Sequence, residues 1–356
     1  MTTLIFLLAT SKHLAQTLSE TDKAAVVTEF SKELQARYVF PELAAKTATV
    51  LKANLESHRY DPDVDGVTFV KALNTDVNEV CHDAHLHVTY SPTTLPIRKD
   101  NAEPSPAEIG REHKMITQVN AGIERVERLD GNLGYIEVRS FLAEPKDAAR
   151  PIQAAFDFLA NTDALILDLR RNGGGQPETV RLLCSYLFDS KPVHLNDLYF
   201  REGHQTMQFW TLKSVPGHRF VNKPVYVLVS HRTGSGAEEC AYDLQCSKRA
   251  TVIGDRTWGG ANPGGMVRLD DHFSAFIPVG RAINPYTHAN WEGTGVTPDI
   301  KANSAEALTT AQKLALNQLL TDASDPDEKQ RLQGALEMVG LGAPTAGTPI
   351  VKIIDK

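Results

Sequence analysis

The chain has 356 residues and a mass of 39.1 kDa, a length that usually corresponds to two or three domains of about 150 residues each. Hydrophobic residues make up 42% and charged residues 23%, close to the average of soluble globular proteins, so a disordered, collagenous or coiled-coil chain is not expected. The formal net charge of −7 argues against a nucleic-acid partner, which would need a basic face. No segment approaches the roughly 20 apolar residues of a membrane-spanning helix, so no stable membrane insertion is expected.

The N-terminus and the cysteines bear on the compartment in which the protein works. Residues 3–9 form a short apolar run that resembles either the end of a secretory signal or the first turn of a helix. The first interpretation predicts a secreted or periplasmic location, and the second leaves a cytoplasmic one open. The cysteines show no zinc-ligand spacing, so we expect no metal and no cofactor. Buried thiols are favoured over a disulfide for the four cysteines, which are Cys81, Cys184, Cys240 and Cys246.

The first part of the chain is predicted to be helical. Thr21 can cap a helix in which apolar residues recur every three or four positions up to Tyr38. A second helix is predicted over residues 41–55 and a third over 65–80. Residues 1–90 are therefore expected to form an N-terminal helical bundle. Residues 91–112, with prolines at four positions, are expected to be a linker.

From residue 113 onward, predicted strands and helices alternate. The strands are expected at residues 133–138, 164–169, 225–229 and 251–254, with helices between them. This order implies parallel pairing with right-handed crossovers. Residues 196–219 form a polar insert whose aromatic side chains either line a cleft or, as we prefer, pack against the sheet. Residues 305–339 are predicted to be helical again, and 340–356 to be a tail.

Two glycine-containing turns are predicted where buried strands end. Residues 172–175 (Asn-Gly-Gly-Gly) follow one strand, and residues 233–236 (Thr-Gly-Ser-Gly) follow another. Ligands of open α/β sheets bind at such ends, and a helix that starts there directs free N–H groups into the same space. Ser235 is therefore a candidate nucleophile, with a simple helix cap as the alternative. The G-x-S-x-G pattern and the usual phosphate-binding and dinucleotide-binding glycine patterns are not matched.

A serine nucleophile needs a base, and the segment 82–87 contains three histidines that could serve. His85 and His87 would face the same side of a strand, so a metal site is one alternative, although no third and fourth ligand stands at a useful spacing. A solvated polar turn is the other alternative.

Five motifs between residues 131 and 300 stand in an order that is found in a known family. They are Gly134-Tyr135-Ile136, Leu167-Asp168-Leu169-Arg170-Arg171-Asn172-Gly173-Gly174-Gly175, Ser235-Gly236-Ala237-Glu238, Ala250-Thr251-Val252-Ile253-Gly254-Asp255 and Gly293-Thr294-Gly295-Val296-Thr297-Pro298-Asp299. With these motifs, residues 131–300 resemble the core of the serine peptidases related to carboxyl-terminal-processing (tail-specific) proteases. This group includes the tricorn core protease and the modules of interphotoreceptor retinoid-binding protein. The N-terminal helices and Asp83-Ala84-His85 resemble the retinoid-binding-protein branch.

The resemblance also indicates which branch supplies the base. Tail-specific proteases use a lysine, and the corresponding position here is Gly260. They also carry a PDZ domain, for which residues 91–130 are too short. The tricorn-like branch uses a histidine from a D-x-H motif, matched by His85, and a glutamate, matched by Glu292. That branch places a serine before the histidine, where this chain has Ala84, so the relay from Glu292 to His85 is direct, water-mediated or missing.

The resemblance thus implies an α/β fold with an N-terminal helical bundle (1–90), a linker (91–112), and a ClpP/crotonase-like ββα-spiral core with C-terminal helices (113–356). It implies a serine-type peptidase in which Ser235 attacks, His85 acts as base and Glu292 orients it. The expected oxyanion donors are amides of Gly236, Gly175 and Gly174.

The expected partner is a peptide or unfolded-protein substrate, and a homo-oligomer is compatible with the sequence. A non-catalytic binder of retinoids or fatty acids is the first alternative function. A crotonase-like acyl-CoA enzyme is the second.

Overall fold

The computed structural model describes residues 17–97 and 105–341. The chain divides into two compact units, which we call the N-terminal unit and the core unit. The N-terminal unit comprises Met1–His82, Leu86–Asp100 and Gly264–Pro278, and the core unit comprises Asp83–His85, Asn101–Pro263 and Val279–Lys356. The apolar run at 3–9 and nearly all of the expected tail at 340–356 lie outside the described residues.

The N-terminal unit contains the three predicted helices, α1 (Glu20–Arg37), α2 (Pro41–Glu56) and α3 (Gly66–Cys81). Helix α1 begins two residues earlier than predicted, because Ser19 rather than Thr21 is its cap. The Ser19 side chain accepts a hydrogen bond from the Asp22 amide, and the Asp22 carboxylate accepts one from the Ser19 amide. This reciprocal pair is a capping box, which satisfies two N–H groups at the helix start.

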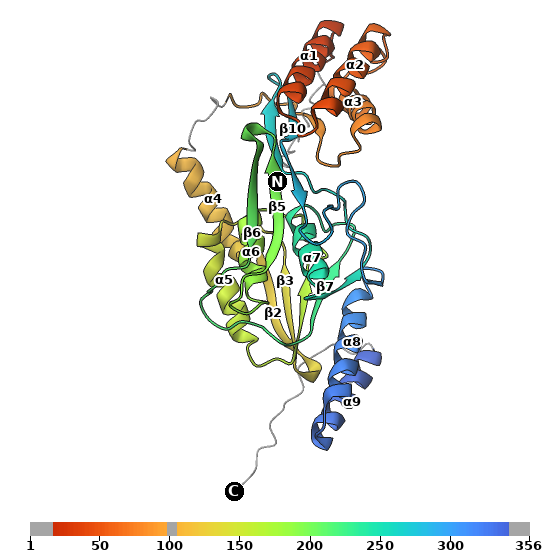
Figure 1. Cartoon of the computed structure of the whole chain (residues 1–356). Coiled ribbons are helices and arrows are strands. Elements are labelled where there is room, and N and C mark those ends of the chain that lie inside the picture. Colours follow the sequence, from red (N-terminus) through yellow and green to blue (C-terminus); the bar gives the residue numbers. More distant parts are fainter. Residues whose placement is uncertain (1–16, 98–104, 342–356) are drawn as a thin grey trace, which may run out of the picture. The chain divides into compact units, whose positions relative to one another are not determined.

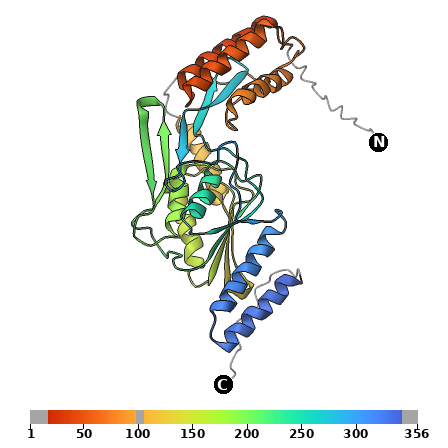
Figure 2. The same ribbon diagram turned by 45° about the vertical axis from the view of Figure 1, so that its right-hand side comes forward.

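The helices of the N-terminal unit pack with a small antiparallel sheet that the sequence did not predict (Figure 2). Its strands, in spatial order, are β1 (His87–Tyr90), β10 (Phe273–Pro278) and β9 (Gly264–Arg268). The rings of Phe69 in α3 and Phe273 in β10 meet edge to face, with centroids 5.9 Å apart. Part of the core of this unit therefore comes from residues far along the chain, and the expected bundle of residues 1–90 is incomplete without them.

The core unit is built on a six-stranded sheet (Figure 1). Every pair of neighbours from β3 to β12 is parallel, and only the edge strand β2 runs antiparallel. The predicted parallel sheet is thereby confirmed. In spatial order the strands are β12 (Ile300–Lys301), β8 (Thr251–Gly254), β7 (Val225–Val229), β4 (Ala164–Asp168), β3 (Leu133–Val138) and β2 (Ile123–Leu129).

Helices cover both faces of this sheet. One face packs against α5 (Pro145–Phe158), α6 (Pro177–Ser185) and α7 (Gly236–Cys246), and the other against α8 (Ala307–Asp322) and α9 (Pro326–Gly340). Successive strand residues point to opposite faces, so the central strands β4 and β7, which are covered on both faces, are apolar along nearly their whole length. The helical region predicted over 305–339 consists of two helices, because Asp325 caps a new helix whose first residue is Pro326.

Two segments of the core unit differ from their expected forms. Helix α4 (Pro106–Gln118) begins inside the predicted linker, with Ser105 and Glu108 forming a capping box. The insert predicted at 196–219 contributes to a hairpin, β5 (His194–Phe200) and β6 (Gln205–Trp210), which pairs with β11 (Gly280–Ile283). Short 3₁₀ turns occur at Asn120–Gly122, Asp130–Asn132 and Glu202–His204. Within the described part of the chain, no helix is both long and apolar enough to cross a membrane.

Candidate active site

The two predicted glycine turns lie against each other at the carboxyl ends of β4 and β7. The amide of Gly234 donates a hydrogen bond to the Asn172 carbonyl, at 3.0 Å. The Thr233 hydroxyl donates to the Leu169 carbonyl, at 2.8 Å. One backbone and one side-chain hydrogen bond thus hold the serine turn and the segment of the glycine turn together, at the ends of two neighbouring parallel strands.

Ser235 occupies an unusual backbone conformation immediately before α7. Its φ of 50° and ψ of −123° lie in a region that L-residues other than glycine rarely adopt, at a cost of about 1–3 kcal/mol. Its side chain is only partly buried. A strained, accessible serine at a strand-to-helix turn is the arrangement that exposes a nucleophile. The local sequence did not reveal it, because Thr233 and Ala237 stand where the G-x-S-x-G pattern has glycines.

Two backbone amides beside Ser235 are available to hold a negatively charged oxygen. Gly236 is the first residue of α7, where N–H groups have no partner within the helix. A Cβ added to Gly236 would lie 3.1 Å from the amide nitrogen of Gly175, so these two backbones are adjacent. The third expected donor differs, because the Gly174 amide already donates to the Asn172 side chain, at 2.8 Å. Gly174 therefore shapes the turn, whereas Gly175 and Gly236 offer the amides.

Glu238 joins the Ser235 turn to the loop 257–260. Its carboxylate is fully buried and accepts hydrogen bonds from the amides of Ser235, Gly259 and Gly260, at 2.8, 2.6 and 3.0 Å. The Thr257 hydroxyl donates to the same carboxylate. Burial raises the pKa of Glu238, and these four donors oppose the rise. The carboxylate thus fixes one segment against the other.

We expect Glu238→Gln to lower the free energy of unfolding by about 1–3 kcal/mol, the cost of leaving buried donors without an acceptor. A glutamine has one acceptor oxygen, so its NH₂ group would face backbone N–H groups that now donate to Glu238. Urea denaturation of both proteins measures the change. The exposed Glu337→Gln is the matched control and should leave stability unchanged. Equal stability of all three proteins would contradict a structural role of the Glu238 carboxylate in holding the two segments together.

His85 is the histidine of the 82–87 segment that belongs to the same unit as Ser235. Its ring lies edge-on to Trp258, with centroids 4.7 Å apart. A Cβ added to Gly260 would lie 2.5 Å from the Cε1 atom of His85. His82 is exposed, and His87 in β1 pairs with Phe276 in β10; both histidines lie in the N-terminal unit.

Two carboxyl groups accompany His85, the buried Asp83 and the partly buried Glu292. The Glu292 carboxylate accepts hydrogen bonds from the amides of Ala84, Ala261 and Asn262, at 2.9, 2.6 and 2.9 Å. The Asp83 carboxylate accepts from the His85 amide, at 3.0 Å, and from the Asn262 side chain, at 2.9 Å. Burial first, and then the charge of Asp83, raise the pKa of Glu292 to about 7. The two carboxyls thus tie the loop 83–85 to the loop 261–262.

One oxygen from each of these two carboxyl groups and one ring nitrogen of His85 lie within 4.8 Å of one another. This spacing is open to a metal ion as well as to proton transfer. Both carboxylates accept N–H bonds from the protein, so their oxygens have hydrogen-bond partners without an ion. The metal pairing of His85 with His87 that the sequence left open would join residues of different units.

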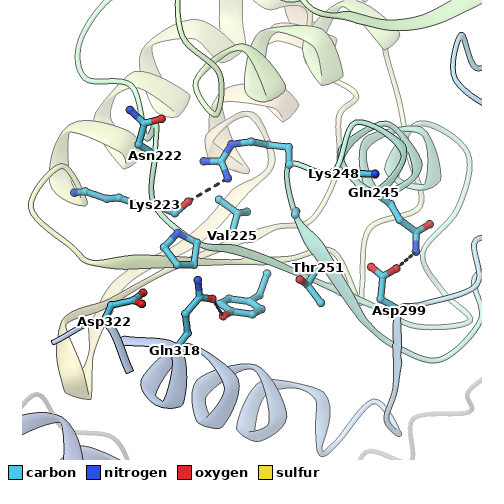
Figure 3. A pocket seen from close by; sticks show the side chains of 13 residues that line it. Asn222, Lys223, Val225, Gln245, Lys248, Thr251, Asp299, Gln318 and Asp322 are labelled. Carbon is cyan, nitrogen blue, oxygen red and sulfur yellow. Dashed lines mark hydrogen bonds between the residues drawn. The ribbon is translucent and has the colours of Figure 1, made fainter. Parts of the chain in front are cut away.

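A cavity of about 530 Å³ lies at the other end of the strands. Val225 and Thr251, at the starts of β7 and β8, line it together with Asp299 and Gln318 (Figure 3). Its polar side chains bind one another, as Gln245 does Asp299, at 2.9 Å. Ligands of parallel sheets bind at the carboxyl ends of strands, so this cavity is separate from the site around Ser235.

Comparison with known proteins gives matches over most of the chain. A sequence model of peptidase family S41 matches residues 132–302, and a model of the N-terminal domain of this family in eukaryotic IRBP matches residues 8–126. Carboxyl-terminal-processing peptidase 2 of Arabidopsis thaliana is 29% identical over 178 residues, which cover 47% of this chain and 31% of that protein. The carboxyl-terminal-processing protease of Synechocystis sp. is 28% identical over 170 residues, with 47% and 37% covered.

Solved structures share the fold at low identity. A protein from Parabacteroides merdae is 18% identical with a TM-score of 0.57, and the match covers 85% of this chain and 99% of that one. Mature CPAF is 12% identical with a TM-score of 0.52, and the match covers 87% and 98%. The alignments with the two curated relatives span well under half of their length.

Proposed function

Because the chain belongs to peptidase family S41, we propose that it is a serine-type peptidase with Ser235 as its nucleophile. The strained and accessible backbone position of Ser235 supports this role. So do the neighbouring amides of Gly175 and Gly236, which can stabilise an oxyanion.

The proposal rests mainly on one observation, the side chains that lie where a side chain of residue 260 would be. Tail-specific relatives have a catalytic lysine there, and this chain has Gly260. A side chain at this position would run into the rings of His85 and Trp258. His85 therefore lies against the side-chain position of residue 260, beside the loop that Glu238 ties to the Ser235 turn. In this proposal the base is His85, which comes from a different part of the chain than the lysine of those relatives.

In the proposed reaction, the Ser235 oxygen attacks the carbonyl carbon of a peptide bond while His85 accepts the hydroxyl proton. The amides of Gly175 and Gly236 donate to the oxygen that becomes negative. His85 then passes the proton to the leaving amine, and an acyl-enzyme forms on Ser235. Water, deprotonated by His85, releases the second product and restores the serine.

Ala84 does not break the connection from Glu292 to the histidine loop. The serine that the tricorn pattern has before the histidine is absent, but the backbone amide of Ala84 donates to Glu292. A backbone N–H thus supplies a contact for which that branch has a side chain. In the proposed mechanism Glu292 holds the loop of His85 in place and stabilises its positive charge.

We extend the proposal to the substrate class, a peptide or an unfolded chain. The names of the curated relatives describe processing of carboxyl termini, and this supports a preference for chains with a free end. The proposal also includes a secreted or periplasmic location, and this part rests only on the apolar run at residues 3–9.

A fluorophosphonate probe tests the proposal directly, since it reacts with a serine only when the hydroxyl is activated. We expect covalent labelling of the tryptic peptide that contains Ser235, together with hydrolysis of an unfolded protein such as casein. His85→Ala should slow labelling by about 10²–10⁴-fold, the usual contribution of a general base. A binding protein of the same fold would leave Ser235 unlabelled, and that outcome would refute the proposal.

A further inference from the structure

The indole of Trp258 is an exposed apolar surface beside both proposed reacting groups. It is 47% exposed, and its ring lies edge-on to His85, with centroids 4.7 Å apart. A Cβ added to Gly234, which directly precedes Ser235, would lie 3.1 Å from the Cε3 atom of Trp258. Single exposed apolar side chains are common on protein surfaces, but this one borders the turn of the nucleophile and the ring of the base.

Hydrogen bonds hold the backbone of Trp258 in place. Its amide donates to the Thr233 carbonyl, at 3.0 Å. The residues on either side of it are held as well, because the Thr257 hydroxyl and the Gly259 amide both donate to the buried carboxylate of Glu238. A group that is ordered before its ligand arrives loses little conformational freedom on binding. Trp258 is therefore suited to be a preorganised contact for a substrate.

We propose that Trp258 is a specificity-determining residue, which selects a large apolar side chain on the substrate residue directly after the scissile bond. The inference rests on the proposed function. In that reaction His85 passes a proton to the leaving amine, so the residue that carries this amine comes next to His85, where Trp258 lies. A large apolar side chain on that residue would be buried against the indole, which removes apolar surface of both groups from water. A small side chain would bury much less.

A purely structural role for Trp258 makes a different prediction. If the indole only supports the His85 ring, its removal slows the cleavage of every peptide by the same factor. If the indole contacts the substrate, its removal slows the cleavage of peptides with a large apolar residue after the scissile bond more than that of others. The ratio of kcat/KM for two peptides that differ only at this residue isolates the contact, because damage to the base cancels in the ratio.

The test uses two peptides built on a casein sequence that the parent protein cleaves, with leucine or alanine directly after the scissile bond. We expect kcat/KM of the parent protein to be about 10-fold higher for the leucine peptide. Trp258→Ala should bring this ratio close to one, and Trp258→Phe, which keeps an aromatic ring, should retain most of it. Trp210→Ala is the matched control, since Trp210 is 42% exposed and also packs on a histidine, His194. It should leave the ratio unchanged.

The rate of fluorophosphonate labelling separates this inference from the proposed function. The leaving group of the probe is fluoride, which offers Trp258 no side chain, so the rate reports only on Ser235 and its base. A ratio near one in the parent protein, or a ratio that Trp258→Ala leaves unchanged, would overturn the inference while labelling and hydrolysis uphold the peptidase. Absence of both labelling and hydrolysis in the parent protein would refute the peptidase proposal, and this inference with it.

Discussion

Ser235→Ala is expected to reduce peptide hydrolysis by about 10⁴–10⁶-fold, the scale on which serine peptidases lose turnover without their nucleophile. The amides of Gly175 and Gly236 remain, so residual hydrolysis above the uncatalysed rate should persist. The Glu238 carboxylate binds the backbone of residue 235 and not its side chain. The fold should therefore be retained. Turnover of a fluorogenic peptide measures the loss of activity, and thermal unfolding measures whether the fold is retained.

A second substitution at the same position makes the test sharper. Ser235→Gly removes the hydroxyl and also relieves a backbone that L-residues rarely adopt. It should be as inactive as Ser235→Ala and more stable by about 1 kcal/mol. Ser247→Ala, which removes a hydroxyl bonded to the Asp243 carbonyl at the end of the same helix, is the matched control. If Ser235→Ala hydrolysed peptides as fast as the parent protein, the nucleophile would lie elsewhere.

The residues around Ser235 show what the sequence could indicate and what it could not. The pattern of apolar strands that end in glycine turns predicted that Ser235 and residues 173–175 lie at the carboxyl ends of neighbouring strands. The structure has them at the carboxyl ends of β7 and β4. The positive φ of Ser235 was not predicted, because no local sequence pattern indicates it at a serine. Glu238 was also missed as a positioning residue, since a glutamate in a first helical turn normally indicates only a favourable charge.

The histidine site depended on contacts between distant segments. Asp83 and Glu292 are separated by more than half of the chain, and no periodic pattern connects them. The motif order of a known family suggested His85 and Glu292, but it gave no reason to include Asp83. Its signal was weak, because an aspartate two residues before a histidine at the end of a helix usually belongs to a turn.

The fold was predicted best where local pattern decides it. The buried strands β4, β7 and β8 and the amphipathic helices α2 and α3 were all expected within a few residues of their bounds. The strands β9 and β10 were missed, since residues 264–278 complete a unit that begins at the other end of the chain. Glycine-rich and short segments such as β9 carry little strand signal, and only their partners stabilise them.

Gly260→Ala is expected to reduce turnover by about 10²-fold, the cost of displacing a catalytic group by roughly 1 Å. The added Cβ would lie 2.4 Å from the Trp258 ring and 2.5 Å from the His85 ring, closer than real contacts allow. Both rings must move, and His85 would leave the place from which it serves Ser235. The loss should appear in kcat, since the amides that hold the substrate oxygen are untouched. Steady-state kinetics with a fluorogenic peptide measures it.

Gly260→Lys should be equally inactive or worse, although it restores the residue that tail-specific relatives use as base. The lysine cannot enter the space that the His85 and Trp258 rings occupy, so it would be directed elsewhere or displace both. Gly265→Ala is the control, because a Cβ there would meet nothing within 4 Å, and its turnover should equal that of the parent protein. Full activity of Gly260→Ala, or a rise in activity with Gly260→Lys, would contradict the assignment of His85 as the base. In that case a lysine-type dyad would be the better account of how this site can work.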